Sequence, residues 1–161
     1  MTVRTGLGVD SHRFAPGRRL VLGGVEIAHE QGLAGHSDAD VVCHAVIDAL
    51  LGAAGMGDIG AHFPDTDARW KDADSLELLR TVVASVREAG WAIANVDATV
   101  MLERPKLAPH RAAIRTALAG ALGLPEDAVN VKATTGEGMG FVGRAEGAAA
   151  LAVATVERAT G

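Results

Sequence analysis

Apolar and polar residues alternate along several stretches of the chain, as they do in strands with one buried face. The clearest stretch is 92–102, where every second residue from Val96 to Leu102 is apolar and most of their neighbours are polar. Residues 2–14 and 130–134 are also predicted to be strands. These segments provide the main elements of a sheet.

A shorter apolar run, 20–27, follows a basic turn at Arg18 and Arg19. Two consecutive glycines interrupt this run, which indicates a hairpin or a bulge. Near the end of the chain, the pattern of residues 148–159 fits a helix as well as a strand. Periodicity alone therefore leaves the last element undecided.

Apolar residues spaced three and four positions apart predict helices elsewhere. The first helix is expected to begin near Ser37, because Ser37 and Asp40 resemble a capping box, and Gly52 and Gly55 suit its end. Further helices are predicted from about residue 75 to 89 and from about 109 to 121. The stretches without periodicity are expected to be loops: 58–71 and 134–147. Together the elements predict one mixed α/β domain over residues 1–161.

The composition fits one domain and excludes several kinds of partner. A chain of 161 residues is long enough for one hydrophobic core. Aromatic residues make up only 3% and tyrosine is absent, so the core must be built mainly from Ala, Val, Leu and Ile. The formal net charge is −5, which argues against binding to nucleic acid or to an anionic membrane.

The cysteine content and the hydropathy pattern indicate the compartment. Cys43 is the only cysteine, so no intrachain disulfide can form, and its apolar neighbours favour a packing role. No apolar stretch approaches the roughly 20 residues that a membrane-spanning helix needs. The first residues lack the basic and apolar regions of a signal peptide. We therefore expect a cytoplasmic protein without a membrane partner.

Asp10 and His12 are candidate metal ligands. They lie two residues apart on a predicted strand, so their side chains leave the same face. His44 is the natural third ligand, and Asp40 and Asp48, one helical turn away on either side, could orient its imidazole. Two histidines and one carboxylate are the ligand pattern of a catalytic zinc site with an open position, although iron or manganese could be held by the same set. A structural histidine on the strand is the alternative.

Two segments could bind phosphate. His36 and Ser37 directly precede the first predicted helix, whose free N–H groups would favour an anion; an ordinary helix cap is the alternative and the commoner case. The segment 134–140 is rich in glycine and threonine, and its hydroxyls and exposed amides could bind phosphate oxygens. Glu137 in this segment could hold a hard cation such as Mg²⁺. A plain glycine-rich turn is the alternative here.

Several short motifs occur in a fixed order along the chain: Gly8-Val9-Asp10-Ser11-His12, Gly35-His36-Ser37-Asp38, His44 to Ala54, Gly57-Asp58-Ile59-Gly60, Phe63-Pro64-Asp65-Thr66-Asp67, Asn130-Val131-Lys132-Ala133-Thr134-Thr135, and Gly143-Arg144. Taken jointly, they resemble the 2-C-methyl-D-erythritol 2,4-cyclodiphosphate synthase family from end to end. The resemblance implies a mixed four-stranded main sheet with helices on one face, a small β-hairpin, and a strand at the end of the chain. It also implies a homotrimer with active sites between subunits.

The same resemblance implies an activity. The enzyme would be a phosphorus–oxygen lyase of the non-mevalonate isoprenoid pathway. It would convert 4-diphosphocytidyl-2-C-methyl-D-erythritol 2-phosphate to the 2,4-cyclodiphosphate and release CMP. Asp10, His12 and His44 would bind zinc, one ion per subunit, and Glu137 would hold Mg²⁺ or Mn²⁺ on the substrate diphosphate. His36 and Thr135 would stabilise the transition state.

The implied substrate contacts extend over most of the motifs. Asp10, Ser11, His12, His36 and Ser37 would contact the substrate. The residues expected along its erythritol and ribose portions are Asp58, Ile59, Gly60, Phe63, Pro64, Asp65, Thr66 and Asp67. The expected cytidine pocket comprises Leu102, Glu103, Arg104, Pro105, Lys106, Leu107 and Ala108. Further contacts are expected from Thr134, Thr135, Gly136, Glu137, Phe141 and Arg144.

Two departures from the family pattern change these expectations. Many relatives carry a third threonine where this chain has Gly136, so a hydroxyl contact is lost and the loop is expected to be more flexible before substrate binds. The stretch 102–104 also differs, so cytidine contacts there are expected to be made by the backbone. A zinc phosphohydrolase and a non-catalytic nucleotide-binding module with a structural metal are the rival functions. The second is disfavoured because structural zinc sites usually have four ligands.

Overall fold

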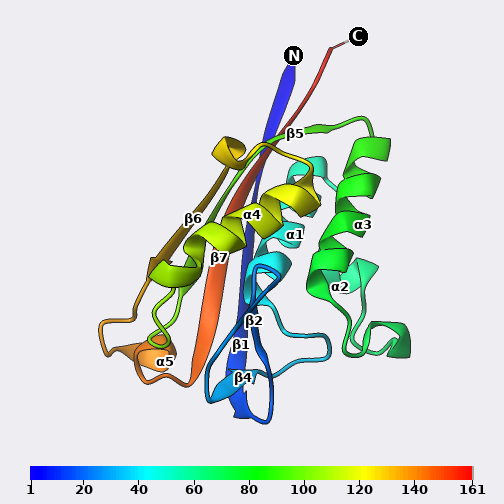
Figure 1. The fold of residues 1–161 in the computed structure, drawn as a ribbon. Helices are drawn as coiled ribbons and strands as arrows, with labels where there is room; N and C mark the ends of the chain where they lie inside the picture. Colours follow the sequence, from blue (N-terminus) through cyan, green and yellow to red (C-terminus); the bar gives the residue numbers. More distant parts are fainter. Residues whose placement is uncertain (161) are drawn as a thin grey trace.

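A mixed five-stranded sheet forms the centre of the fold, which the computed structural model describes for residues 1–160 (Figure 1). The strand order is β4-β1-β7-β5-β6. Their bounds are β1 Thr2–Pro16, β4 Gln31–Leu33, β5 Ala92–Met101, β6 Val129–Thr134 and β7 Gly147–Arg158. Only β5 and β6 pair in parallel, whereas β1, β4 and β7 pair antiparallel with their neighbours. The sequence-based expectation of four strands was therefore one short.

The additional strand is the short β4, which pairs with the end of β1 through Phe14 and Leu33. Three residues are too few to show an alternating pattern, so β4 exists because of this pairing and not because of a local preference. The final segment is confirmed as a strand. β7 pairs with β1 along one edge and with β5 along the other, which makes it the central strand of the sheet.

The longer helices lie on one face of the sheet (Figure 1). They are α1 (Val41–Ala54), α3 (Ser75–Glu88) and α4 (Arg111–Leu122). Helices α1 and α4 pack on the strands, and α3 packs against these two helices. Alternate residues of β7 from Ala148 to Val156 are buried beneath them, and the residues between are mostly exposed or half-buried on the other face. The helix predicted from residue 109 begins two positions later, because Ala108–His110 forms a separate 3₁₀ turn, η2.

Helix α1 lies very close to β1, and small residues make this possible. A Cβ atom added at Gly8 would lie 1.8 Å from the carbonyl oxygen of Ala45, and one at Gly6 would lie 2.0 Å from that of Ala49. No side chain could occupy either position without moving the helix. The glycines of β1 therefore set the height of α1 above the strand that carries Asp10 and His12.

Helix α1 begins at Val41, four residues later than the predicted start at Ser37. Asp40 is its N-cap, and its fully buried carboxylate accepts hydrogen bonds from the amides of Val42 and Cys43. The same carboxylate accepts from the amides of Gly23 and Gly24, in the turn of the small hairpin formed by β2 (Leu20–Leu22) and β3 (Val25–Ile27). Burial raises the pKa of Asp40, although the hydrogen bonds from the amides of Gly24, Cys43 and Gly23 oppose this effect. The contacts with the hairpin explain why Asp40, and not Ser37, caps the helix.

The predicted loops contain short helical turns. Within 58–71 these are α2 (Ile59–His62) and η1 (Ala68–Trp70), and within 134–147 there is α5 (Gly140–Gly143). A further turn, η3 (Glu126–Ala128), precedes β6. Cys43 is buried, as its apolar neighbours predicted. Within residues 1–160, each helix is too short or too polar to cross a lipid bilayer.

Candidate functional site

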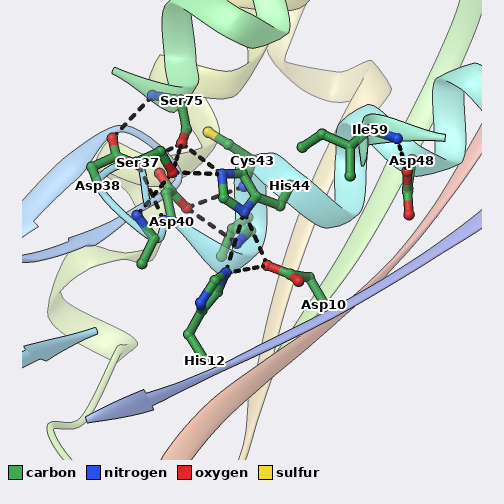
Figure 2. Close-up of polar contacts among 12 residues, drawn as sticks. Asp10, His12, Ser37, Asp38, Asp40, Cys43, His44, Asp48, Ile59 and Ser75 are labelled. Carbon is green, nitrogen blue, oxygen red and sulfur yellow. Dashed lines mark hydrogen bonds and ion pairs between the residues drawn. The ribbon is translucent and has the colours of Figure 1, made fainter. Parts of the chain in front are cut away.

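Asp10, His12 and His44 bring three metal-binding atoms together (Figure 2). The Nε2 of His12 lies 3.0 Å from Oδ2 of Asp10, and the Nδ1 of His44 lies 3.1 Å from the same oxygen. The two ring nitrogens are 3.4 Å apart. Asp10 and His12 project from the same face of β1, and His44 reaches them from α1. The structure thus confirms the predicted convergence of these side chains.

The spacing of these atoms fits a single ion. Ligands at about 2.0–2.1 Å from a tetrahedral zinc ion are separated by roughly 3.3 Å, which is close to the three observed distances. All three residues are at least partly shielded from solvent. A group of two imidazoles and one carboxylate at these distances is able to hold a divalent metal ion and to leave a coordination position free.

The ionisation of Asp10 and His12 is coupled. Burial disfavours the charged form of Asp10, but the hydrogen bonds and charges of His12 and His44 outweigh it and hold the pKa of the carboxyl at about 2. Burial also opposes the protonation of His12, yet the hydrogen bond to Asp10 and its charge raise the pKa of the imidazole. The carboxylate of Asp10 is therefore available as an anionic ligand throughout the neutral range.

Serine hydroxyls, not aspartates, orient the ring of His44 (Figure 2). Its Nε2 lies 2.8 Å from Oγ of Ser75 and 3.2 Å from Oγ of Ser37. The hydroxyl of Ser75 in turn donates to the carboxylate of Asp38. The sequence-based interpretation that Asp40 or Asp48 would orient this ring was wrong. Asp40 caps α1 as described above, and Asp48, one turn further along the helix, accepts instead from the amide of Ile59.

A second hydrogen bond fixes His12. Its Nδ1 lies 2.9 Å from the carbonyl oxygen of Ala34. A carbonyl can only accept, so Nδ1 carries the proton and Nε2 is left with a lone pair directed at the other two ligands. Both imidazoles are therefore held through the nitrogen that faces away from the metal-binding group, as is usual for metal-binding histidines.

The three candidate ligands open into a cavity of about 450 Å³. Its other walls include His36 and Ser37, for which substrate contacts are predicted. The ring of His36 lies with Nε2 3.0 Å from the carbonyl oxygen of Asp67. Of the residues expected along the erythritol and ribose portions, the following line the cavity: Ile59, Gly60, Phe63, Pro64 and Asp65.

The other predicted contact residues of the segment 58–67 are outside the lining of this cavity: Asp58, Thr66 and Asp67. Asp58 caps α2 through the amide of Ala61, and Asp67 pairs with Arg69 and caps η1. Thr66 is exposed. The sequence reasoning also missed three lining residues, Gly35, Trp70 and Leu78. Trp70 was the most recognisable, because a tryptophan in a polar segment without periodicity requires an explanation. Leu78 had no such signal, since it reads as an ordinary buried helix residue.

The residues predicted to form a cytidine pocket lie around a second, smaller cavity of about 190 Å³. Its lining comprises Leu102, Glu103, Pro105, Lys106, Leu107, Ala108, Ala133, Thr134 and Thr135. Arg104 is exposed and lies outside this lining. The two cavities have no residue in common. Within one chain, the metal-binding group and the candidate cytidine pocket are therefore separate.

The glycine-rich loop between β6 and α5 is held in place by hydrogen bonds and close packing. The carboxylate of Glu103 accepts from the amides of Gly136, at 2.9 Å, and of Gly138, at 3.3 Å. A Cβ added at Gly136 would lie 2.5 Å from the amide nitrogen of Gly143, so the loop packs closely on α5. The expectation that Gly136 loosens the loop is not supported by these contacts. Two of the amides proposed for phosphate are already engaged, whereas the side chain of Glu137 is exposed.

Phe141 lies in α5, and Arg144 directly follows this helix. Phe141 shares a third cavity, of about 220 Å³, with Ser11 and His12, and Arg144 pairs with Glu146 at 3.4 Å. This places Phe141 near the strand that carries two of the candidate metal ligands. The predicted site residues thus fall into three neighbourhoods of the chain: the metal-binding cavity, the candidate cytidine pocket, and the surface around Phe141.

Comparison with known proteins identifies the family. The model of the YgbB family matches residues 3–157. The chain belongs to the YgbB family. A curated relative of this YgbB family member, the 2-C-methyl-D-erythritol 2,4-cyclodiphosphate synthase of Salinibacter ruber, is 65% identical over 157 residues, which cover 98% of this chain and 100% of that protein. The resemblance inferred from the motifs is confirmed.

Solved structures of related proteins share the fold of this YgbB family member. The bifunctional IspDF of Campylobacter jejuni matches with a TM-score of 0.94 and 46% identity; the match covers 98% of this chain but only 43% of that protein. A CDP-bound form of 2C-methyl-D-erythritol-2,4-cyclodiphosphate synthase matches with a TM-score of 0.88 and 40% identity, over 96% of this chain and 100% of that one. The fold therefore occurs in a relative that binds a cytidine nucleotide.

Proposed function

We propose that this chain converts 4-diphosphocytidyl-2-C-methyl-D-erythritol 2-phosphate to 2-C-methyl-D-erythritol 2,4-cyclodiphosphate and CMP, as a phosphorus–oxygen lyase of the non-mevalonate isoprenoid pathway. The observation that carries the proposal is the convergence of Asp10, His12 and His44 at the wall of a cavity large enough for a small phosphorylated polyol. The likeness to named synthases over nearly their whole length supports the choice of substrate.

The reaction needs positioning more than it needs acid–base chemistry. An oxygen of the 2-phosphate forms a bond to the β-phosphorus, and the bond from that phosphorus to the bridging oxygen breaks, so that CMP leaves with the electron pair. The attacking phosphate is already ionised near neutral pH, so no dedicated general base is required. The site must instead fold the substrate back on itself and neutralise crowded negative charge.

Within this proposal Asp10, His12 and His44 hold a zinc ion, which supplies Lewis-acid stabilisation of phosphate oxygens and not a hydroxide. His36 and Thr135 donate hydrogen bonds to oxygens that gain charge in the transition state. His36 suits this role because it lines the same cavity as the three ligands. Glu137 holds Mg²⁺ or Mn²⁺ on the diphosphate, for which its exposed carboxylate is suited.

The substrate is expected to bridge the two cavities. Its erythritol part would occupy the metal-binding cavity, and its cytidine the pocket between the ends of β5 and β6. Since the two cavities share no residue, we propose a homotrimer in which adjacent subunits each contribute one of them. Apolar residues on the sheet face without helices support such an assembly. Leu7 and Val9 are 62% and 57% exposed there, and Leu151 and Val153 are 36% and 38% exposed.

Incubation with the proposed substrate tests the function directly. We expect phosphorus NMR to show a cyclic diphosphate and chromatography to show CMP in equal amount. Linear phosphate products would identify a phosphohydrolase, and tight CMP binding without turnover would identify a nucleotide-binding module. Light scattering should give three times the chain mass of 16.5 kDa. The cytoplasmic location remains part of the proposal and is checked by cell fractionation.

A further inference from the structure

We propose that Glu103 is a positioning residue that couples the candidate cytidine pocket to the cation-binding loop. This proposal rests on the proposed function and adds to it a residue that acts through the backbone of the loop. Glu103 lies two residues after the end of β5 and is half-buried in the wall of the candidate cytidine pocket. It makes its two hydrogen bonds not within that pocket but with the amides of Gly136 and Gly138, on either side of Glu137.

The backbone on either side of Glu137 directs two amides at one anion. Glu137 and Gly138 both have positive φ, at 53° and 74°. Amides that converge in a turn form a site for an anionic oxygen. Here the amides of Gly136 and Gly138 converge on the carboxylate of Glu103. The amide of Glu137, in between, donates to Oγ1 of Thr135 at 3.2 Å. All three consecutive amides are therefore satisfied within the loop and its neighbour.

This arrangement links residues with different proposed roles. The amide of Leu102 donates to the carbonyl oxygen of Thr134 at 3.1 Å, so the ends of β5 and β6 are joined at the base of the loop. Above that bond, Glu103 fixes the amides that flank Glu137, and Thr135 holds the amide of Glu137 itself. A cytidine bound against 102–108 would thus meet a loop whose backbone at Glu137 is already held in place. The preorganised backbone reduces the ordering that cation binding would otherwise require.

A substitution series in the full-length protein tests the coupling. Glu103→Gln retains the shape but replaces one acceptor with a donor, and Glu103→Ala removes both acceptors. Glu88→Gln, at the exposed end of α3, is the matched control. In ligand-free protein, amide hydrogen exchange at Gly136 and Gly138 should accelerate at least about tenfold in Glu103→Ala and by less in Glu103→Gln. Melting curves and zinc content, read in parallel, should not change.

The functional readout is divalent-cation binding in the presence of CDP, measured with Mn²⁺ by electron paramagnetic resonance. We expect Mn²⁺ affinity to fall about tenfold in Glu103→Ala, with kcat falling alongside it and KM changing less. Faster exchange with unchanged Mn²⁺ affinity and kcat would overturn the coupling, and so would unchanged exchange. If the wild type bound CDP and Mn²⁺ but released no CMP from the proposed substrate, the proposed reaction would be wrong. Amide exchange and Mn²⁺ affinity would still decide whether Glu103 couples the pocket to the loop.

Discussion

The hydroxyl of Ser75 lies 2.8 Å from Nε2 of His44, and the carboxylate of Asp38 accepts a hydrogen bond from the same hydroxyl. Because the hydroxyl proton is given to Asp38, the oxygen of Ser75 is left to accept from the imidazole. The N–H of His44 therefore sits on Nε2, and the lone pair sits on Nδ1, which faces Asp10 and His12. Ser75 is the first residue of α3, so this chain of contacts also ties that helix to the candidate metal site.

Replacing Ser75 with alanine should weaken metal binding without abolishing it. The ring of His44 would lose the partner that fixes its tautomer and orientation, although Ser37 remains within 3.2 Å. Loss of such an outer hydrogen bond typically lowers metal affinity by about 10–100-fold. Competition with a chromogenic zinc chelator measures the change. Ser85→Ala is the control, because Ser85 lies on the same helix and only donates to the carbonyl of Thr81. Equal affinities in the two variants would contradict the assigned role of Ser75.

Removing a ligand should have a larger effect. His44→Ala leaves only Asp10 and His12 to hold an ion, so we expect stoichiometric metal and CMP release both to be lost. The fold should largely persist, because the imidazole lines the cavity and its hydrogen-bond partners belong to the site. Metal analysis after gel filtration and far-UV circular dichroism check the two halves of this prediction. One bound zinc per chain in the variant would refute the ligand assignment.

Glu137→Gln should distinguish the role of the proposed Mg²⁺ or Mn²⁺ from that of the proposed zinc ion. The carboxamide keeps the size of the side chain but removes the charge that a hard cation requires. We expect turnover to slow by about tenfold or more and the response of the rate to added Mg²⁺ to weaken. Zinc content should not change, because Glu137 lies outside the group formed by Asp10, His12 and His44. Wild-type rates across a Mg²⁺ titration would show that this side chain does not hold the cation.

The metal-binding group was predictable because local rules largely determine it. Two side chains two residues apart on a strand must share a face, so Asp10 and His12 could be paired from the sequence alone. His44 also lies beside them, as expected for a third ligand, although its placement 34 residues from Asp10 depends on the fold. Its surroundings were not predictable. Ser75 reads as an ordinary residue in the first turn of a helix, and only the packing of α3 beside α1 brings it to His44.

The difference between local rules and contacts between distant segments also explains which predictions about the fold were wrong. Ser37 and Asp40 are both good capping residues, and the amides of the distant hairpin turn decide between them by binding Asp40. Glu103 and Gly136 were each recognised as departures from the family pattern, but their hydrogen bond depends on the neighbouring ends of β5 and β6. Contacts between segments distant in sequence leave no periodic pattern, so only the structure could reveal them.

The close approach of α1 to β1 gives a prediction that links stability to the metal site. In Gly8→Ala, the new Cβ would lie 1.8 Å from the carbonyl oxygen of Ala45, so α1 must shift away from the strand. We expect the free energy of unfolding to fall by about 3 kcal/mol, as overpacking of a core can cost. Ala45 follows His44 directly, so the shift should also separate His44 from Asp10 and His12 and lower metal affinity. Urea denaturation and chelator competition measure the two effects.

Gly52→Ala is the matched control, because it places a methyl group at the same interface without a clash. The nearest atom to its Cβ would be the Cα of Gly6 at 3.8 Å, an ordinary contact distance. An alanine within α1 should raise the free energy of unfolding by about 0.5–1 kcal/mol, because glycine loses more backbone entropy on folding. Metal affinity should remain that of the wild type. If Gly8→Ala were as stable as Gly52→Ala and bound zinc equally well, the spacing between β1 and α1 would not control the geometry of the candidate metal site.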